Sequence, residues 1–409
     1  MLKSLEKKHI YFAGLLLVAI GLTLSPALMS IGQAVLVLNW LFDSEAGPRY
    51  SALWRNKTVV YFLLIFLVHV IGLAYTQNFE YAMKDLKIKL PLLLLPVVIG
   101  TSRVLEKREL HFVYYAVLVS VFISSLISFY LYLQMSDGAE DTLRNISPII
   151  SHIRLSLIAC IAFFISLYFA WEYYSKNKFW SVGMLMYALW MLYFISILGA
   201  RAGYLSILVA SAFILFYKCI EYKKYAYIFV AVGVFVLGSW LAYQFSEPIQ
   251  KRVDEIFVEV ESHQEGENPS GKSISQRFVY WSIAREIFSE NWLIGVGTGD
   301  IDDAFKKYYA THETNLEQQF RHRAHNQYLT MLCTFGLLGF LIFMFALVYP
   351  YWNRKLYFDI MATAFLIVLL ISMLTEDTLE TQAGATFAAY FYSLFILRKG
   401  IADIQRVSY

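Results

Sequence analysis

Residues 195–210 have the sequence ISILGARAGYLSILVA, in which two apolar runs flank a single arginine, Arg201. Apolar runs long enough to cross the hydrocarbon core of a bilayer, about 20 residues each, recur along the chain. The composition agrees, because 58% of the 409 residues are hydrophobic and only 16% are charged. Such runs predict helices, which satisfy their own backbone, rather than the alternating strands of a barrel. We therefore predict an all-α, polytopic integral membrane protein.

The fourth apolar run, KLPLLLLPVVIG, is short and contains Pro91 and Pro96, so we expect a broken or re-entrant helix there. The first run follows a basic N-terminus but precedes no small-residue cleavage signal, so we interpret it as a retained span rather than a signal peptide. The hydropathy pattern predicts 12 spans in all, near residues 10–25, 27–42, 58–75, 89–100, 110–135, 153–171, 179–199, 202–220, 226–244, 326–352, 360–376 and 380–397.

Basic residues are concentrated in the short loops that face the cytoplasm if the N-terminus is inside. We therefore predict that both termini are cytoplasmic and that the longest polar segment lies outside. The predicted organisation is nine spans in residues 1–244, one large outer loop at 245–325, and three spans with a cytoplasmic tail in 326–409. The net charge of +3 gives no ground for a nucleic-acid partner. The three cysteines have neither disulfide nor metal-ligand spacing.

Within the large outer loop, ESHQEGENPSGKS at 261–273 is typical of a mobile loop, and ISQRFVYWSIAREIFSE at 274–290 predicts an amphipathic helix on the membrane face. Arg277 falls at the edge of its apolar stripe and Arg285 near the middle, so either could point into a cleft. Ser273 is the expected N-cap. The next segment, NWLIGVGTGD, supplies three glycines to a turn whose spacing is not that of a phosphate-binding loop. The predicted apolar stripe of the helix at 274–290 consists of Ile274, Phe278, Trp281 and Phe288.

Two residues at the outer ends of spans are the first candidates for a functional site. A charge near hydrocarbon depth is costly unless it faces a cavity or a partner, so Arg201 is interpreted as functional rather than as an interfacial anchor. His325 opens a span within RAHNQY at 323–328, where a neutral imidazole could accept a proton; the alternative is a hydrogen-bonded helix cap.

Further polar residues share the predicted outer face. His152 and Arg154 begin the sixth span, where substrate contact and interfacial anchoring are both open; a guanidinium can grip phosphate oxygens in pairs. Acidic residues between the last two spans could orient a base, bind acceptor hydroxyls or simply be solvated. A metal site built from His312, His322 and His325 with Glu313 or Glu317 matches no common zinc spacing, and no metal is expected. The remaining substrate-binding candidates are Arg285, Arg323, Asn326, Glu376 and Asp377.

The order of three segments resembles the bacterial O-antigen ligase and polymerase superfamily: ARAGYLSILVA at 200–210, QRFVYWSIAREIFSENWLIGVGTGD at 276–300, and HNQYLTMLCTFGLLGF at 325–340. The resemblance implies a GT-C type glycosyltransferase of the bacterial inner membrane that works at the periplasmic face without a cofactor. It assigns Arg201 and Arg277 to the donor diphosphate and His325 to activation of the acceptor hydroxyl. Many relatives have a serine before the first arginine, where this chain has Ala200.

The function expected from this resemblance is an O-antigen ligase, which transfers a glycan from undecaprenyl diphosphate to lipid A-core with inversion at the anomeric carbon. The alternatives within the superfamily are an O-antigen polymerase, whose acceptor is a second lipid-linked repeat, and a protein O-oligosaccharyltransferase. A polysaccharide transporter or flippase belongs to a different class, and it would show inverted repeats and ionisable residues at mid-membrane. The chain shows no clear repeat, and its candidate residues lie at span ends.

Overall fold

The computed structural model describes residues 2–42, 53–134, 146–223, 247–264 and 268–398, with a few single positions between 233 and 244. These parts are helical and contain no strand. The long helices are α1 (Leu2–Leu24), α2 (Pro26–Leu41), α4 (Lys57–Ile71), α5 (Phe79–Thr101), α6 (Lys107–Leu133), α7 (His152–Tyr173), α8 (Lys178–Leu198), α9 (Arg201–Glu221), α14 (Gln327–Asn353), α15 (Ile360–Thr375) and α16 (Gln382–Tyr392).

Each of these helices coincides with a predicted span, whereas the predicted span at 226–244 lies almost entirely outside the described residues. Seven described helices are long and apolar enough to cross a membrane: α1, α4 with its short extension Gly72–Ala74, α6, α7, α8, α9 and α14. Three more, α2, α15 and α16 with the π turn Ser393–Leu397, are apolar but shorter. The protein is therefore an all-helical, multi-pass membrane protein, and the count of 12 is not confirmed.

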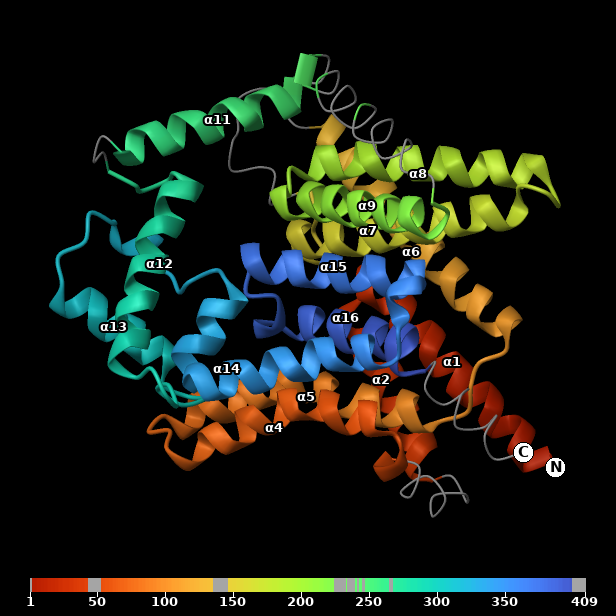
Figure 1. The fold of residues 1–409 in the computed structure, drawn as a ribbon, viewed down its shortest axis with the longest axis horizontal. Helices are drawn as coiled ribbons and strands as arrows, with labels where there is room; N and C mark the ends of the chain where they lie inside the picture. The colour runs from red at the N-terminus through yellow and green to blue at the C-terminus, as the bar shows by residue number, and fades with distance from the viewer. Residues whose placement is uncertain are drawn as a thin grey trace.

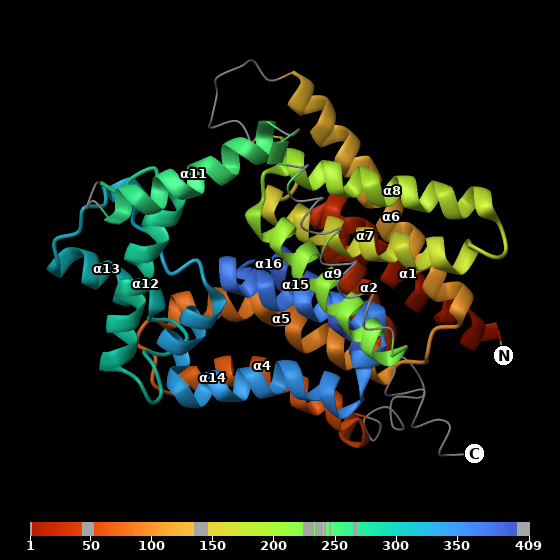
Figure 2. The same cartoon turned by 45° about the horizontal axis from the view of Figure 1, so that its top comes forward.

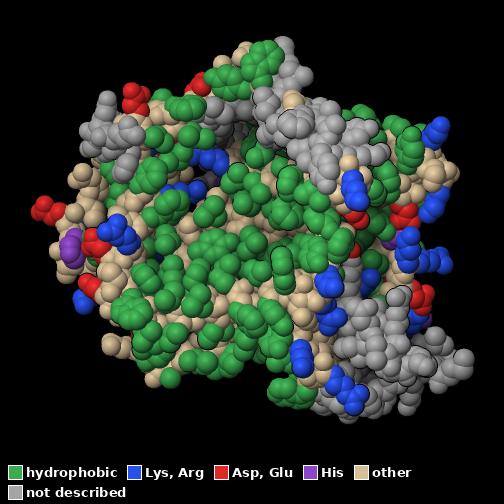
Figure 3. Space-filling model, in the orientation of Figure 1, with side chains coloured by type: hydrophobic (Ala, Val, Ile, Leu, Met, Phe, Trp, Pro, Cys, Tyr) green, Lys and Arg blue, Asp and Glu red, His purple; other side chains and the backbone are tan. Residues whose placement is uncertain are grey.

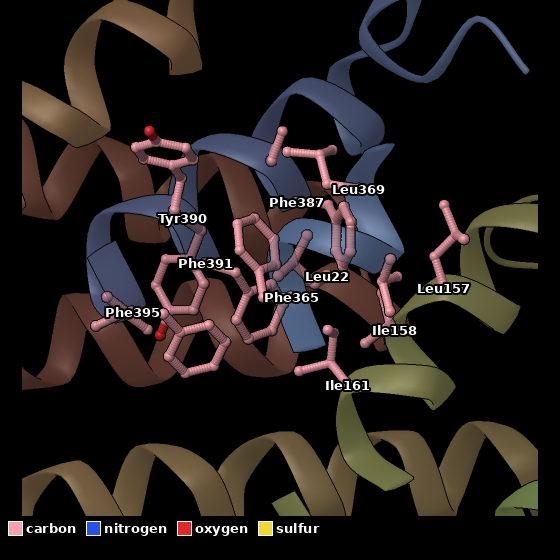
Figure 4. Packing of buried hydrophobic residues seen from close by; sticks show 14 of the residues in the cluster. Leu22, Leu157, Ile158, Ile161, Phe365, Leu369, Phe387, Tyr390, Phe391 and Phe395 are labelled. Atoms are coloured by element: carbon pink, nitrogen blue, oxygen red, sulfur yellow. The ribbon is translucent and has the colours of Figure 1, made fainter. Parts of the chain in front are cut away.

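The membrane helices surround an aromatic core. Figure 4 shows Phe365 of α15 facing Phe387 and Phe391 of α16, with Ile158 of α7 close by, and all four side chains are buried. Ring pairs such as Phe387–Phe391, with centroids 5.4 Å apart, meet edge to face. This core packs α7, α15 and α16 against one another.

Helix α5 is unbroken, contrary to the expected break at its prolines. Pro91 and Pro96 lie inside a helix that runs from Phe79 to Thr101. Neighbouring helices cover this segment, because α5 packs against α4, α2 and α16. A proline is tolerated in a membrane helix when surrounding protein covers the freed backbone groups.

The large insert folds into α11 (Glu247–Gln264), α12 (Ser273–Glu290) and α13 (Ile301–Thr311). Figures 1 and 2 both place these helices at one end of the bundle, away from the start of α1. Helices α12 and α13 pack with the start of α14 around a separate small core that includes Ile283, Ile287 and Phe305. Burying each such side chain stabilises the fold by about 1.5–3 kcal/mol.

Three local predictions for the insert need correction. The loop expected at 261–273 is shorter, because α11 extends to Gln264; residues 265–267 lie outside the described residues, and 268–272 form a loop. Ser273 is the first residue of α12 rather than its cap, which is Lys272. The buried face of α12 also differs from the expected stripe, because Phe278 is exposed. The residues that are buried are Ser275, Tyr280, Ile283, Ala284 and Ile287.

The glycine-rich segment after α12 forms a turn, as predicted, and it docks onto a break in α14. Gly336 interrupts α14 with φ 63° and ψ −167°, a conformation open almost only to glycine. Four backbone hydrogen bonds join the turn to the break: Val296 N to Cys333 O, Gly297 N to Thr334 O, Leu337 N to Trp292 O and Leu338 N to Leu293 O. The insert is thus attached to the membrane bundle through paired backbone.

Candidate functional site

A cavity of about 920 Å³ lies where the insert meets the ends of α7, α15 and α16. Its polar lining residues come from four separate segments, which the fold brings to one end of the bundle. Figure 3 shows basic side chains in a hollow between α11, α12 and the bundle. The charged and histidine residues of the lining are His152, Arg154, Asp302, Lys306, Arg321, His322, Arg323, His325, Glu376, Asp377 and Glu380.

His325, Arg277 and Glu376 meet at one side of the cavity. Glu376 Oε1 accepts a hydrogen bond from Arg277 Nη2 at 2.9 Å, and its second oxygen, Oε2, lies 3.7 Å from His325 Nδ1. Arg277 itself is not part of the lining and reaches the site through this carboxylate. Glu376 therefore contacts both Arg277, the predicted donor-binding arginine of the insert, and His325, the predicted base.

The backbone of His325 is unusual, because its φ is 46°, in the left-handed region. The imidazole keeps 41% of its surface exposed. Its ring lies beside Tyr280, with centroids 5.9 Å apart, and beside His322, at 5.7 Å. Burial raises the pKa of the Tyr280 phenol to about 12, so it stays protonated beside the imidazole.

His325 is not the helix cap, which was the alternative interpretation. The cap is Asn326, whose Oδ1 accepts hydrogen bonds from the backbone N–H groups of Tyr328 and Leu329 at 3.0 and 3.2 Å. Asn326 is buried and does not line the cavity. The two polar residues before α14 therefore differ in role: Asn326 caps the helix, and His325 presents its imidazole to the cavity.

Arg323 belongs to a buried network that forms one wall. Its Nη1 donates to the Tyr81 hydroxyl at 3.0 Å and lies 3.8 Å from Glu380 Oε2. The same carboxylate oxygen accepts a hydrogen bond from Lys89 Nζ at 3.0 Å, and Gln327 Nε2 donates to Oε1 at 3.0 Å. Burial would raise the pKa of Glu380, but Lys89 and Arg323 lower it well below its usual range, so the carboxylate is charged.

Lys89 is almost fully buried in the structure. The sequence analysis did not single it out. It also pairs with Asp85, one helical turn earlier in α5. Its position within an apolar run was a usable signal, because an ammonium group inside the membrane requires an anionic partner. That partner, Glu380, lies 291 positions further along the chain and could not be assigned from spacing.

Two guanidinium groups line the cavity without a carboxylate within ion-pair distance among the described residues. Arg154 Nε donates to Thr381 Oγ1 at 2.7 Å, and its Nη1 donates to Ser151 Oγ at 3.2 Å. Arg321, which the sequence did not single out, donates to the carbonyl oxygen of Leu316 at 3.2 Å. Because these partners are neutral, the two positive charges remain available to an anion.

Arg201 is placed differently from the expectation. It begins α9, but its Nη2 lies 3.4 Å from Glu259 and 3.6 Å from Glu255, both in α11, and it does not line the cavity. Both candidate arginines thus have carboxylate partners in the structure, Arg201 in α11 and Arg277 at Glu376. The partners lie far along the chain, so the sequence did not reveal them.

The remaining candidates have distinct positions. His152 lines the cavity, whereas Arg285 is exposed on α12 and lies outside the lining. Asp377 is buried and accepts a hydrogen bond from Thr330 Oγ1 at 2.6 Å. Burial raises the pKa of the Asp377 carboxyl above its usual value.

The histidines of the alternative metal site do not gather at one point. The His312 ring stacks on Tyr308, with centroids 4.1 Å apart, and it does not line the cavity with His322 and His325. Within the described parts of the chain, no three His, Cys, Asp or Glu side chains form a group suited to a metal ion.

Comparison with known families supports the resemblance carried by the three sequence segments. A search of curated proteins gave no match. The family model described as O-antigen ligase matches residues 186–344, a segment that contains Arg201, Arg277 and His325, whereas Arg154 and Glu376 lie outside it. This match supports the O-antigen ligase and polymerase superfamily and an enzyme activity of the glycosyltransferase-like, ligase type.

Proposed function

We propose that the protein is an O-antigen ligase of the bacterial inner membrane. It transfers a glycan from undecaprenyl diphosphate to the lipid A-core of lipopolysaccharide, and the reaction takes place at the periplasmic face. Both termini lie in the cytoplasm, and the described cavity is the site of transfer. No metal ion or organic cofactor takes part.

The single observation that carries this proposal is the composition of the cavity. It combines two guanidinium groups that pair with no carboxylate of the described residues, Arg154 and Arg321, with an imidazole, His325, that faces a carboxylate. Guanidinium groups can grip the oxygens of a diphosphate in pairs. The imidazole can remove the proton of a hydroxyl group. A lipid diphosphate donor and a hydroxyl acceptor require these two functions together.

In the proposed reaction, the acceptor hydroxyl oxygen attacks the anomeric carbon of the glycan while the bond from that carbon to the diphosphate oxygen breaks. The hydroxyl proton passes to His325 Nε2. The electron pair of the broken bond remains on undecaprenyl diphosphate, whose added charge the arginines stabilise. Attack opposite the leaving group inverts the anomeric configuration.

Glu376 links the two halves of this reaction. Binding of a diphosphate at Arg277 exchanges the Glu376 oxygen for phosphate oxygens and leaves the carboxylate free for His325. A movement of under about 1 Å brings Glu376 Oε2 from 3.7 Å into hydrogen-bond distance of His325 Nδ1. With Nδ1–H held by the carboxylate, the lone pair of Nε2 is available as the base.

Arg201 is proposed to take part in donor binding, as the resemblance implies. Its ion pairs with Glu255 and Glu259 connect the start of α9 to α11. For Arg201 to reach the donor, phosphate oxygens must replace these carboxylates. His152, Arg323 and Asp377 line the same cavity and are proposed as substrate contacts. Arg285 and Asn326, which lie outside the lining, are the weakest of the proposed contacts.

The acceptor distinguishes the ligase from its closest alternatives. Purified protein is given one lipid-linked glycan donor with lipid A-core, a second lipid-linked repeat, or an unfolded peptide rich in serine. The ligase proposal predicts product only with lipid A-core. Chain extension of the lipid-linked repeat would identify a polymerase, and glycosylated peptide would identify a protein O-oligosaccharyltransferase.

A further inference from the structure

The turn between α12 and α13 exposes apolar side chains outside the cavity. Trp292, Leu293 and Ile294 keep 54%, 43% and 51% of their surface exposed. No charged residue lies between Glu290 and Asp300. Contiguous exposed apolar side chains of this kind mark a surface that contacts a membrane, a protein or a ligand.

The carbonyl groups of residues 292–294 all have hydrogen-bond donors. The carbonyl oxygens of Trp292 and Leu293 accept hydrogen bonds from the N–H groups of Leu337 and Leu338, at 2.8 and 3.2 Å. The Ile294 carbonyl accepts a hydrogen bond from the Tyr75 hydroxyl at 2.7 Å. Non-helical backbone is tolerated at membrane depth where surrounding protein covers it. Here α14 and Tyr75 cover these carbonyl groups.

The exposed side chains continue the apolar outer surface of the neighbouring membrane helices. On α14, Leu337, Leu338 and Leu341 are exposed, and on α4, which packs against α14, so are Leu67 and Ile71. Figure 3 shows hydrophobic side chains gathered over this part of the molecule.

The turn meets α14 well inside that helix. Gly336 follows the first residue of α14, Gln327, by nine positions, which at about 1.5 Å per residue corresponds to roughly 14 Å along the axis. That distance is close to half of the roughly 30 Å hydrocarbon thickness of a bilayer.

We propose that residues 292–294 insert into the hydrocarbon of the leaflet that faces the large insert, where lipid acyl chains contact Trp292, Leu293 and Ile294. The turn is thereby a membrane anchor for the insert, and it fixes the end of α12 at a set depth. The argument does not use the proposed transferase activity, and its test is independent of that activity.

Quenching of a fluorescent thiol probe at Leu293→Cys tests this proposal in the full-length protein in phosphatidylcholine nanodiscs. The native cysteines are buried, and labelling of the parent protein measures their background. Lipids brominated on their acyl chains should quench the probe strongly, and aqueous iodide should quench it weakly. Ser282→Cys, at an exposed position of α12, is the control and should show the opposite pattern.

Strong quenching by iodide at position 293, with or without quenching by brominated lipid, would overturn the proposal. Absence of quenching by either agent, as expected if a protein partner covered the turn, would overturn it too. Should the Leu293→Cys protein fail to fold, Ile294→Cys provides the same measurement.

Discussion

At the scale of single residues, His325 combines an exposed imidazole with a left-handed backbone. His325→Asn is the informative substitution, because asparagine tolerates that backbone conformation but cannot act as the base. Transfer should fall by about 10²–10⁴-fold, the usual value of general-base catalysis, while binding of the lipid diphosphate donor persists. Turnover and donor binding are measured on the same preparation. Near-normal turnover would remove the base assignment and favour Glu376 or Asp377.

Arg277 and Arg285 offer a matched pair on α12. Arg277→Ala should abolish transfer and leave the Glu376 carboxylate without its guanidinium partner, whereas Arg285→Ala should lose little activity because Arg285 is exposed outside the cavity and is at most a peripheral contact. Arg277→Lys should rescue poorly, since an ammonium group cannot make the paired contact of a guanidinium. Transfer assays at equal expression decide between them. The reverse result, with Arg285→Ala inactive and Arg277→Ala active, would show that the wrong arginine was assigned.

The dependence on metal follows from the same assignments. If His325 acts as a base rather than a ligand, transfer should be unchanged after treatment with a chelator. Loss of transfer with recovery on addition of zinc would revive the metal site of His312, His322 and His325.

Much of the candidate site could be predicted from the sequence, because membrane spans bring their outer ends to one face. This rule placed Arg154, Arg323, His325 and Glu376 together. The rule did not reveal the ion-pair partners, because Arg201 pairs with Glu259 of α11, a helix of the insert. Such pairs depend on how the insert folds, which the pattern of spans does not predict.

At the scale of elements, the break in α14 is the feature most sensitive to a single substitution. A Cβ at Gly336 would lie 2.3 Å from the backbone of Leu293, and alanine strongly disfavours the backbone conformation of Gly336. Gly336→Ala should therefore destabilise the docked turn by about 1–3 kcal/mol. Thermal unfolding in detergent measures the effect. Gly183→Ala is the control, because its Cβ meets nothing within 4 Å, and an equal Tm for both variants would contradict the proposed role of the break.

The limits of prediction at this scale have physical causes. Apolar length alone predicts membrane helices, so eleven predicted spans coincide with helices. The break expected at Pro91 and Pro96 did not occur because neighbouring helices cover α5. The face of α12 was misassigned because apolar residues occur on two of its faces, and only its packing partners decide that Ile283 and Ile287 are buried while Phe278 is exposed.

At the scale of the whole molecule, orientation in the membrane is the first prediction. Asn268, an exposed residue between α11 and α12, should lie outside the cell membrane. Asn268→Cys should react with an impermeant thiol reagent in intact spheroplasts, whereas Ser175→Cys, between α7 and α8, should react only after lysis. The opposite labelling would place the cavity in the cytoplasm and exclude a periplasmic transfer site.

The most direct measurement reconstitutes the purified protein in vesicles with undecaprenyl-diphosphate-linked glycan and lipid A-core. It follows both the bond that is formed and the side of the membrane on which the donor lies. The proposed ligase should produce glycosylated lipid A-core together with free undecaprenyl diphosphate, and donor molecules should not cross the bilayer. Movement of intact donor across the bilayer without any new glycosidic bond would contradict the account and identify a transporter.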